Sequence, residues 1–200
     1  MERINVDFSY LEGTNCYCSA ESAERIRREI AALPVGAFHC IGTGDYHYQT
    51  LFWLERLTGP FCLVLFDNHP DDQGGAFGGE LISCGGWVAL ARRLPLLRAD
   101  VWIRSAEDFP ALDALPDLPV YLSLDLDVLS EEYARTDWDQ GTMTLAELEG
   151  ALRGLAARRK LLGVDLCGGH TIQKGASPED LALNASTGEA LYGIFREILI

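Results

Sequence analysis

Unbroken runs of apolar residues, rather than strictly alternating ones, mark the strands that this sequence predicts. The two clearest runs lie at residues 61–66 and 119–124, and acidic residues follow each of them. Continuous apolar runs of this length are typical of parallel strands that are buried on both faces. Shorter runs predict further strands at residues 4–8, 37–41, 101–103 and 161–166.

Helix signals lie between these runs. Pro34 ends the first predicted helix, because proline cannot continue one. Thr144 and Glu147 form a capping box that starts another. The predicted helices lie at residues 19–33, 49–57, 87–94, 144–160 and 178–200. Strands that alternate with helices predict a single α/β domain over residues 1–200, with a mostly parallel sheet between two layers of helices.

Size and charge narrow the class of protein. The chain has 200 residues, of which 48% are apolar, enough for one domain with a sizeable core. Its formal net charge of −14 argues against nucleic acid and anionic membrane surfaces as partners. No apolar run approaches the roughly 20 residues of a membrane span, and the first residues do not resemble a signal peptide. We therefore expect a cytoplasmic protein whose six cysteines form no disulfides.

The run that ends at Phe66 leads directly into Asp67, His69 and Asp71. Side chains two residues apart on an extended chain point the same way, so these three would form one row. Two carboxylates and an imidazole suit a divalent ion such as manganese, iron or zinc. An acidic turn that is merely exposed to solvent is the alternative.

Two other predicted strands also end in potential ligands. Asp125 and Asp127 follow the run at residues 119–124, and His47 lies shortly after the run at residues 37–41. The carboxyl ends of parallel strands meet at one edge of a sheet, so the three segments could build a common site there. Several neighbouring carboxylates repel one another, which favours a bound cation.

These three segments resemble the signature motifs of the arginase, agmatinase and formiminoglutamase superfamily, the ureohydrolases. The motifs stand here in the family's order at residues 44–47, 67–71 and 123–127, and the resemblance covers roughly residues 37–170. The first motif departs from the family's Gly-Gly-Asp-His, because Tyr46 precedes the histidine. The resemblance implies an arginase-like fold, two manganese ions per chain and, as is common in the family, a homo-oligomer.

The resemblance also implies ligands and a reaction. One ion would be held by His47, Asp67, Asp71 and Asp125, and the other by Asp67, His69, Asp125 and Asp127, with Asp67 and Asp125 bridging them. In the family, a metal-bridging hydroxide attacks the planar carbon of a guanidinium or other amidine. The resemblance thus implies a hydrolase of non-peptide C–N bonds in a small linear guanidino or formimino compound. Asp71 would carry a proton to the leaving nitrogen.

The sequence departs from the family where the substrate would be recognised. Cys84 takes the place of a histidine that serves in proton transfer, and could replace it or be an inert buried thiol. Asp165 takes the place of a glutamate that pairs with the guanidinium, and could bind substrate or cap the next turn. His170 follows two glycines beside the expected site and is a candidate base. Trp138 and Asp139 lie in a loop that should border the pocket, where we expect them to contact substrate.

Three other functions fit parts of this pattern. A zinc amide deacetylase of similar fold would use one metal with Asp, His and Asp ligands, which leaves His47 and Asp71 without a role. A haloacid-dehalogenase-type phosphatase would use Asp125 and Asp127 but would ignore the motif at residues 67–71. A metal-stabilised binding protein without turnover would explain the altered recognition residues. Metal content and turnover separate these alternatives.

Overall fold

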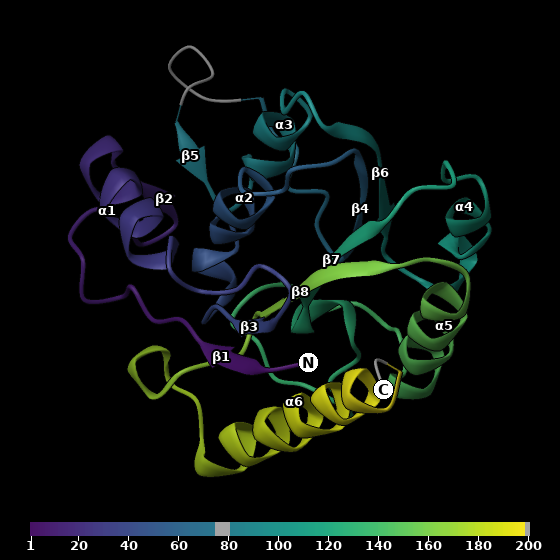
Figure 1. Cartoon of the computed structure of the whole chain (residues 1–200). Helices are drawn as coiled ribbons and strands as arrows, with labels where there is room; N and C mark the ends of the chain where they lie inside the picture. Colours follow the sequence, from purple (N-terminus) through teal and green to yellow (C-terminus); the bar gives the residue numbers. More distant parts are fainter. Residues whose placement is uncertain (75–80, 199–200) are drawn as a thin grey trace.

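A six-stranded sheet, in which every neighbouring pair of strands is parallel, forms the middle layer of the fold (Figure 1). The computed structural model describes residues 1–74 and 81–198. Across the sheet the strands lie in the order β1, β3, β8, β7, β4, β6. Their bounds are Arg3–Asn5 for β1, Phe38–Cys40 for β3, Phe61–Phe66 for β4, Leu97–Ile103 for β6, Val120–Asp125 for β7 and Leu161–Cys167 for β8.

Helices cover both faces of this sheet (Figure 1). Helices α1, α2 and α3 pack on one face, and α5 and α6 pack on the other. The three-layer α/β architecture that the sequence predicts is therefore confirmed. In the described part of the chain, no helix has both the length and the apolar character that crossing a membrane requires. The helices are α1 Ala20–Ile30, α2 Gln49–Leu54, α3 Trp87–Ala91, α4 Pro110–Asp113, α5 Leu145–Arg158 and α6 Pro178–Ile198.

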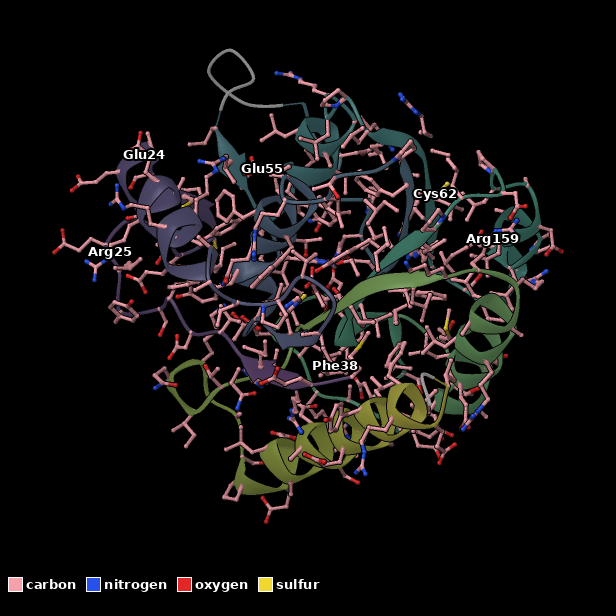
Figure 2. All side chains as sticks on the ribbon, viewed as in Figure 1. Glu24, Arg25, Phe38, Glu55, Cys62 and Arg159 are labelled. Atoms are coloured by element: carbon pink, nitrogen blue, oxygen red, sulfur yellow. The ribbon has the colours of Figure 1, made fainter. Side chains whose placement is uncertain are left out.

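Strand β4 shows why the apolar runs are unbroken. Leu63 and Leu65 belong to the core cluster beneath α1, α2 and α3, whereas Val64 and Phe66 belong to the cluster beneath α5 and α6. Successive side chains of a strand point to opposite faces, so a strand covered on both sides needs apolar residues at every position. Figure 2 shows how side chains fill the space on both sides of the sheet.

The predicted starts of the two long C-terminal helices are confirmed by their capping hydrogen bonds. Before α5, the backbone N–H of Glu147 donates to Thr144 Oγ1 (3.2 Å), and the N–H of Thr144 donates to Glu147 Oε2 (2.8 Å). Before α6, the backbone N–H of Asp180 donates to Ser177 Oγ (3.1 Å). Each cap satisfies backbone donors that a helix start would otherwise leave unpaired.

The edges of the sheet differ from the prediction. Strand β6 spans Leu97–Ile103. The prediction included residues 101–103 alone, because Arg98 and Asp100 interrupt the apolar pattern of the strand. It pairs with β4 at the edge of the sheet, where polar residues are tolerated. Strand β1 is also shifted, from the predicted residues 4–8 to Arg3–Asn5. A two-stranded antiparallel sheet of β2, Tyr17–Cys18, and β5, Ile82–Ser83, was not predicted from the sequence.

The strand order brings four chain connections together. All six strands run in the same direction, so their carboxyl ends lie along one edge. Strands β8 and β7 occupy the centre, and the chain passes from β3 on one side of them to β4 on the other. The strand order therefore reverses direction at the centre of the sheet. In open α/β sheets, ligands bind in the crevice at such a point, beyond the carboxyl ends of the strands. The segments after β3, β4, β7 and β8 meet at that edge.

Candidate metal centre

The predicted metal ligands meet in a cavity of about 380 Å³ at this edge of the sheet. His47 follows a 3-10 turn, Gly44–Tyr46, that comes after β3. Three further ligands come directly after β4. Asp125 is the last residue of β7, and the next 3-10 turn, Leu126–Val128, carries Asp127. The cavity is lined by all six residues: His47, Asp67, His69, Asp71, Asp125 and Asp127.

We name His47, Asp67, Asp71 and Asp125 the inner group. The Nδ1 atom of His47 lies 3.1 Å from Asp67 Oδ2 and 3.1 Å from Asp71 Oδ2. The same nitrogen lies 3.5 Å from Asp125 Oδ2. The other ring nitrogen, Nε2, is 2.7 Å from Ser123 Oγ. This hydrogen bond holds the ring so that Nδ1 faces the three carboxylates.

We name Asp67, His69 and Asp127 the outer group. The Nδ1 atom of His69 lies 2.8 Å from Asp127 Oδ2 and 3.5 Å from Asp67 Oδ1. Asp67 therefore presents Oδ2 to the inner group and Oδ1 to the outer group, as a bridging carboxylate does. Asp125 Oδ1 accepts the backbone N–H of Asp127 (2.9 Å), which links the second shared residue to the outer group.

Hydrogen bonds from neighbouring residues fix the remaining carboxylates. The indole N–H of Trp87 donates to Asp71 Oδ2 (2.7 Å). The backbone N–H of Asn68 donates to Asp127 Oδ1 (2.9 Å), and the backbone N–H of His69 donates to Asp67 Oδ1 (2.6 Å). Ligands oriented in this way lose little freedom when a metal ion binds, which favours binding.

The spacing within each group fits the ligands of a divalent ion. An ion bonded to nitrogen and oxygen at about 2.0–2.2 Å keeps neighbouring ligand atoms about 2.8–3.6 Å apart, from octahedral to tetrahedral geometry. The separations between imidazole nitrogen and carboxylate oxygen run from 2.8 to 3.5 Å. Ligand atoms of His47, Asp67 and Asp71 all lie within 4.8 Å of one another, and so do those of Asp67, His69 and Asp127, whereas Asp125 meets this limit with His47 and Cys167. Carboxylate and imidazole donors together suit manganese, iron or zinc. The residues present therefore fit the metals that the sequence motifs imply.

Electrostatics also favour a cation here, because buried carboxylates outnumber their donors. Burial raises the pKa of Asp125 well above its ordinary value, and the charges of Asp127 and Asp67 raise this pKa further. Burial also raises the pKa of Asp127, although the hydrogen bond from His69 opposes the shift. Hydrogen bonds to Asp127 and Asp67 raise the pKa of His69 to about 10. A bound divalent ion would displace the protons that these groups otherwise keep.

Comparison with solved structures identifies the fold of this chain. No family model matches the chain. It is 34% identical, over 64% of its length, to an uncharacterized protein of Thermotoga maritima, and it spans 56% of that protein. Among solved structures it is similar to the proclavaminate amidino hydrolase from Streptomyces clavuligerus, with a TM-score of 0.68 and 18% identity. That similarity covers 86% of this chain and 69% of the hydrolase. The chain has the arginase fold.

Two other structures support the same assignment. The agmatine ureohydrolase of Thermoplasma volcanium matches with a TM-score of 0.65 and 15% identity, over 90% of this chain and 71% of that one. The arginase from Bacillus caldovelox matches with a TM-score of 0.60 and 16% identity, over 88% of this chain and 77% of that one. The arginase-like fold that the sequence motifs imply is therefore confirmed.

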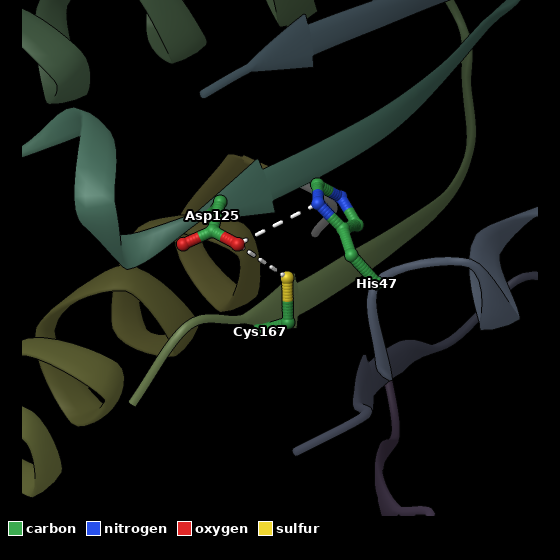
Figure 3. A group of neighbouring side chains, drawn as sticks. All are labelled: His47, Asp125 and Cys167. Carbon is green, nitrogen blue, oxygen red and sulfur yellow. Dashed lines mark hydrogen bonds and ion pairs between the residues drawn. The ribbon is translucent and has the colours of Figure 1, made fainter. Parts of the chain in front are cut away.

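Within this arginase fold, Cys167 lies beside the inner group, and the sequence analysis missed it. Cys167 is the last residue of β8 and pairs in register with Asp125 on β7. Its sulfur lies 3.1 Å from Asp125 Oδ2, next to His47 (Figure 3). The signal that could have revealed it was its position immediately after the predicted strand at residues 161–166.

Gly168 leaves room for Asp125. It has a φ of +96°, and a Cβ built on it would lie 1.9 Å from Asp125 Oδ1. A side chain at position 168 would therefore occupy the place of this carboxylate. Glycine tolerates both the left-handed backbone and the close approach. The arginase fold thus holds Asp125 against the backbone that follows β8.

Two of the residues predicted to act on substrate also line the cavity. Trp138 closes one wall, and its indole N–H donates to Asp45 Oδ1 (3.3 Å). Cys84 lines another wall. Burial, and then the nearby Cys16, Asp71 and Asp45, raise the pKa of Cys84 to about 12. At neutral pH this thiol is therefore protonated and could donate a hydrogen bond, but it is not a base.

Asp165 was predicted to bind substrate, but the structure places it in the core. It is fully buried in β8 and two residues before the strand ends. Its Oδ1 accepts the hydroxyl of Tyr121 (2.7 Å) and lies 3.1 Å from His39 Nδ1. The ring of His39 stacks on Trp53 with 3.8 Å between centroids, so this histidine also belongs to the core. The sequence interpretation ended the strand too early.

The structure also places Asp139 and His170 outside the cavity wall. The Asp139 side chain is exposed, while its backbone carbonyl accepts the side-chain amide of Asn68 (2.7 Å). Nε2 of the partly exposed His170 lies 3.0 Å from the backbone oxygen of Lys174. Neither residue is among the described lining residues of the cavity.

Proposed function

We propose that this chain is a divergent member of the arginase, agmatinase and formiminoglutamase superfamily. It hydrolyses a non-peptide C–N bond in a linear amidine, such as a guanidino or formimino compound. One observation carries this proposal: the inner and outer groups share Asp67 and face the same cavity. The named proteins whose fold it shares, an amidino hydrolase, an agmatine ureohydrolase and an arginase, support the choice of substrate class.

The proposed cofactor is a pair of divalent ions, with manganese expected in both positions. His47, Asp67, Asp71 and Asp125 would hold one ion, and Asp67, His69, Asp125 and Asp127 the other. When bound, such a pair lowers the pKa of a shared water enough to supply hydroxide near neutral pH. The four carboxylates described above provide the negative charge that two divalent ions need for neutralisation, and the two imidazoles are neutral ligands.

Asp71 is the proposed proton carrier. Its carboxylate lines the cavity, and the indole N–H of Trp87 holds Oδ2 in place (2.7 Å). Oδ1 is the atom that would take the proton and later deliver it to the leaving nitrogen. A positioned acid–base group of this kind contributes roughly 10²–10⁴-fold to a rate.

The cavity wall favours a neutral or cationic substrate. Among its described lining residues there is no lysine or arginine, and four of them are aspartates. An amidine or guanidinium group is planar and carries N–H donors, so it complements carboxylate oxygens. The ring of Trp138 and the side chains of Gln73 and Ser83 are among the other described lining residues and could contact the rest of the substrate.

A zinc amide deacetylase is the second candidate, since one observation favours it. The outer group alone supplies the Asp, His and Asp ligands that such an enzyme uses. The two candidates differ in whether His47 is needed. If His47→Asn keeps full activity with zinc on an amide substrate, the deacetylase is correct. Loss of turnover on amidines in the same variant supports the dinuclear hydrolase.

The test has two steps. The first is elemental analysis of protein purified without added metal, where we expect about two divalent ions per chain. The second is a screen of guanidino, formimino and amide compounds for release of urea, ammonia or formamide. Protein without any transition metal would contradict the proposal. Bound metal with no turnover on any compound would instead identify a metal-stabilised binding protein.

Two further properties stay predictions. We expect a cytoplasmic location, and we expect the homo-oligomer that the resemblance implies. Fractionation of cells and light scattering of the purified protein would check them. Neither result affects the chemistry of the metal centre.

A further inference from the structure

We propose that the sulfur of Cys167 is an additional ligand of the inner group. This ligand makes the inner position prefer a thiophilic divalent ion, such as zinc or cobalt, over manganese. The inference rests on the proposed function, because it requires that the inner group binds a cation. It changes the expected occupancy of that group from manganese to a softer metal and leaves the outer group unchanged.

The position of Cys167 is set by the sheet. Strands β7 and β8 are parallel neighbours, and Asp125 pairs in register with Cys167 at their carboxyl ends. Paired residues of adjacent strands point to the same face, so the thiol and the carboxylate lie side by side. Cys167 is 2% exposed. It therefore sits at the floor of the metal centre rather than on the cavity wall.

The distances fit one shared cation. Asp125 Oδ2 lies 3.5 Å from His47 Nδ1 and 3.1 Å from Cys167 Sγ. A cation bonded to sulfur at about 2.3 Å and to oxygen or nitrogen at about 2.0–2.2 Å keeps these ligand atoms roughly 3.0–3.6 Å apart. Ligand atoms of His47, Asp125 and Cys167 all lie within 4.8 Å of one another. A cation bound to Asp125 Oδ2 could therefore also bind the Nδ1 atom of His47 and the sulfur of Cys167.

The chemistry of sulfur gives the preference. Thiolate ligands select zinc and other soft ions, whereas carboxylate and imidazole without sulfur suit manganese as well. The outer group of Asp67, His69 and Asp127 contains no sulfur. The two positions therefore differ in the metal that they favour. On binding, a metal–sulfur bond replaces the S–H bond of Cys167, and the proton passes to the solvent.

A purely structural role for Cys167 makes a different prediction. If the thiol only donates a hydrogen bond to Asp125, a serine hydroxyl at the same place could donate instead. Cys167→Ser would then bind zinc as the wild type does. If the sulfur is a ligand, the serine variant loses more zinc affinity than the roughly 10–100-fold that loss of an outer-shell partner costs. Its affinity for manganese would change less.

The experiment uses the full chain, stripped of metal and titrated with cobalt(II) without oxygen. Bound cobalt gives an intense near-ultraviolet charge-transfer band only when a thiolate is a ligand. We expect this band in the wild type and its loss in Cys167→Ser, which should still bind cobalt. Cys84→Ser is the matched control, because this second thiol lines the cavity, and it should keep the band.

Each other outcome overturns the inference. Cobalt that binds to the wild type without the band, a band that persists in Cys167→Ser, or a band lost in Cys84→Ser would each exclude Cys167 as the ligand, while the proposed hydrolase would stand. No metal binding at all would overturn the proposed function too. If Cys167→Ser does not fold, X-ray absorption of zinc-loaded wild type decides, through a sulfur neighbour at about 2.3 Å or its absence.

Discussion

Two buried clusters pair histidine with aspartate, and strands β7 and β8 reach both of them. One is the core cluster of His39, Tyr121 and Asp165. The other is the inner group, at the carboxyl edge, to which β7 contributes Asp125 and beside which β8 places Cys167. Their residue types overlap, yet they have different roles.

The balance between carboxylates and donors separates the two clusters. In the core cluster there is one carboxylate: its Oδ1 accepts the hydroxyl of Tyr121 and lies 3.1 Å from Nδ1 of His39, whose ring stacks on Trp53, and its Oδ2 is buried without a hydrogen-bond partner among the described residues. In the inner group, three carboxylate oxygens surround one imidazole nitrogen and face a cavity. A single buried carboxylate can be satisfied by neutral donors, whereas several together need protons or a cation. This imbalance, rather than burial, identifies the site.

The largest effect that would test this contrast comes from Asp125→Asn. The change removes a charge from the inner group, so we expect loss of at least one bound ion. We expect a fall in turnover on the order of ten-thousand-fold, because the pKa of a metal-bound water is roughly 7 against 15.7 in bulk. Metal content and kcat measure it.

Asp117→Asn is the matched control for this prediction. It makes the same change just before β7, at a carboxylate whose side chain is 94% exposed. Metal content and kcat should stay at wild-type values. A similar loss in both variants, or full metal content in Asp125→Asn, would contradict the assignment of the inner group.

Removal of metal should leave a protein whose stability falls as pH rises above neutrality. In metal-free protein the folded pKa of His69 is about 10, above its ordinary 6.5, and the pKa values of Asp125 and Asp127 are also raised. The folded state then binds more protons than the unfolded state, so stability falls as pH rises from about 6.5 to about 10. Metal binds only the folded state, and adds about 4 kcal/mol at a thousandfold excess over Kd.

Urea denaturation with and without a chelator checks this prediction at several pH values. The free energy of unfolding of the metal-free protein should decrease between pH 6.5 and pH 9.5. The metal-loaded protein should be more stable than the metal-free protein, most clearly at the alkaline end. Rising stability of the metal-free protein over this interval would show that the cluster does not hold excess protons.

Tyr121→Phe tests the core cluster, which should affect stability but not metal binding. It removes the hydroxyl that donates to Asp165 Oδ1 and leaves the buried carboxylate with fewer donors. We expect a loss of about 1–3 kcal/mol in the free energy of unfolding. Metal content should not change. Loss of metal in this variant would show that the two clusters are coupled.

The smallest expected effect is that of Cys84→Ser. The thiol has a pKa of about 12 and is protonated at neutral pH, and serine keeps a hydrogen-bond donor at the cavity wall. We expect kcat to change less than about tenfold, and the pH profile between pH 6 and 9 to keep its shape. A larger loss together with the loss of one limb of that profile would support proton transfer by Cys84, one of the two roles that the sequence left open.

The sequence was sufficient for the architecture and for bringing the candidate metal ligands together, for two physical reasons. Continuous apolar runs mark buried parallel strands, and the carboxyl ends of such strands share one edge. His47, Asp67 and Asp125 could therefore be placed together without a structure, although they are far apart in the chain. The capping box at Thr144 was equally predictable, because its hydrogen bonds are local.

The roles of other residues depend on contacts that the sequence does not display. Asp165 looked like a residue at a strand end, but β8 continues through Cys167 and leaves Asp165 two residues inside the core. Its partners, Tyr121 and His39, come from other strands. Cys167 was missed because its proximity to Asp125 depends on the register between β7 and β8. Side-chain register across neighbouring strands was the missing information.

The most direct test of the central claim is anomalous X-ray diffraction from crystals of metal-stripped protein reloaded with excess manganese. We predict two manganese peaks in the cavity. One should contact His47 and Asp71, the other should contact His69 and Asp127, and Asp67 should lie between them. A single peak, or no peak in contact with these residues, would contradict the claim that the three segments bind a pair of ions.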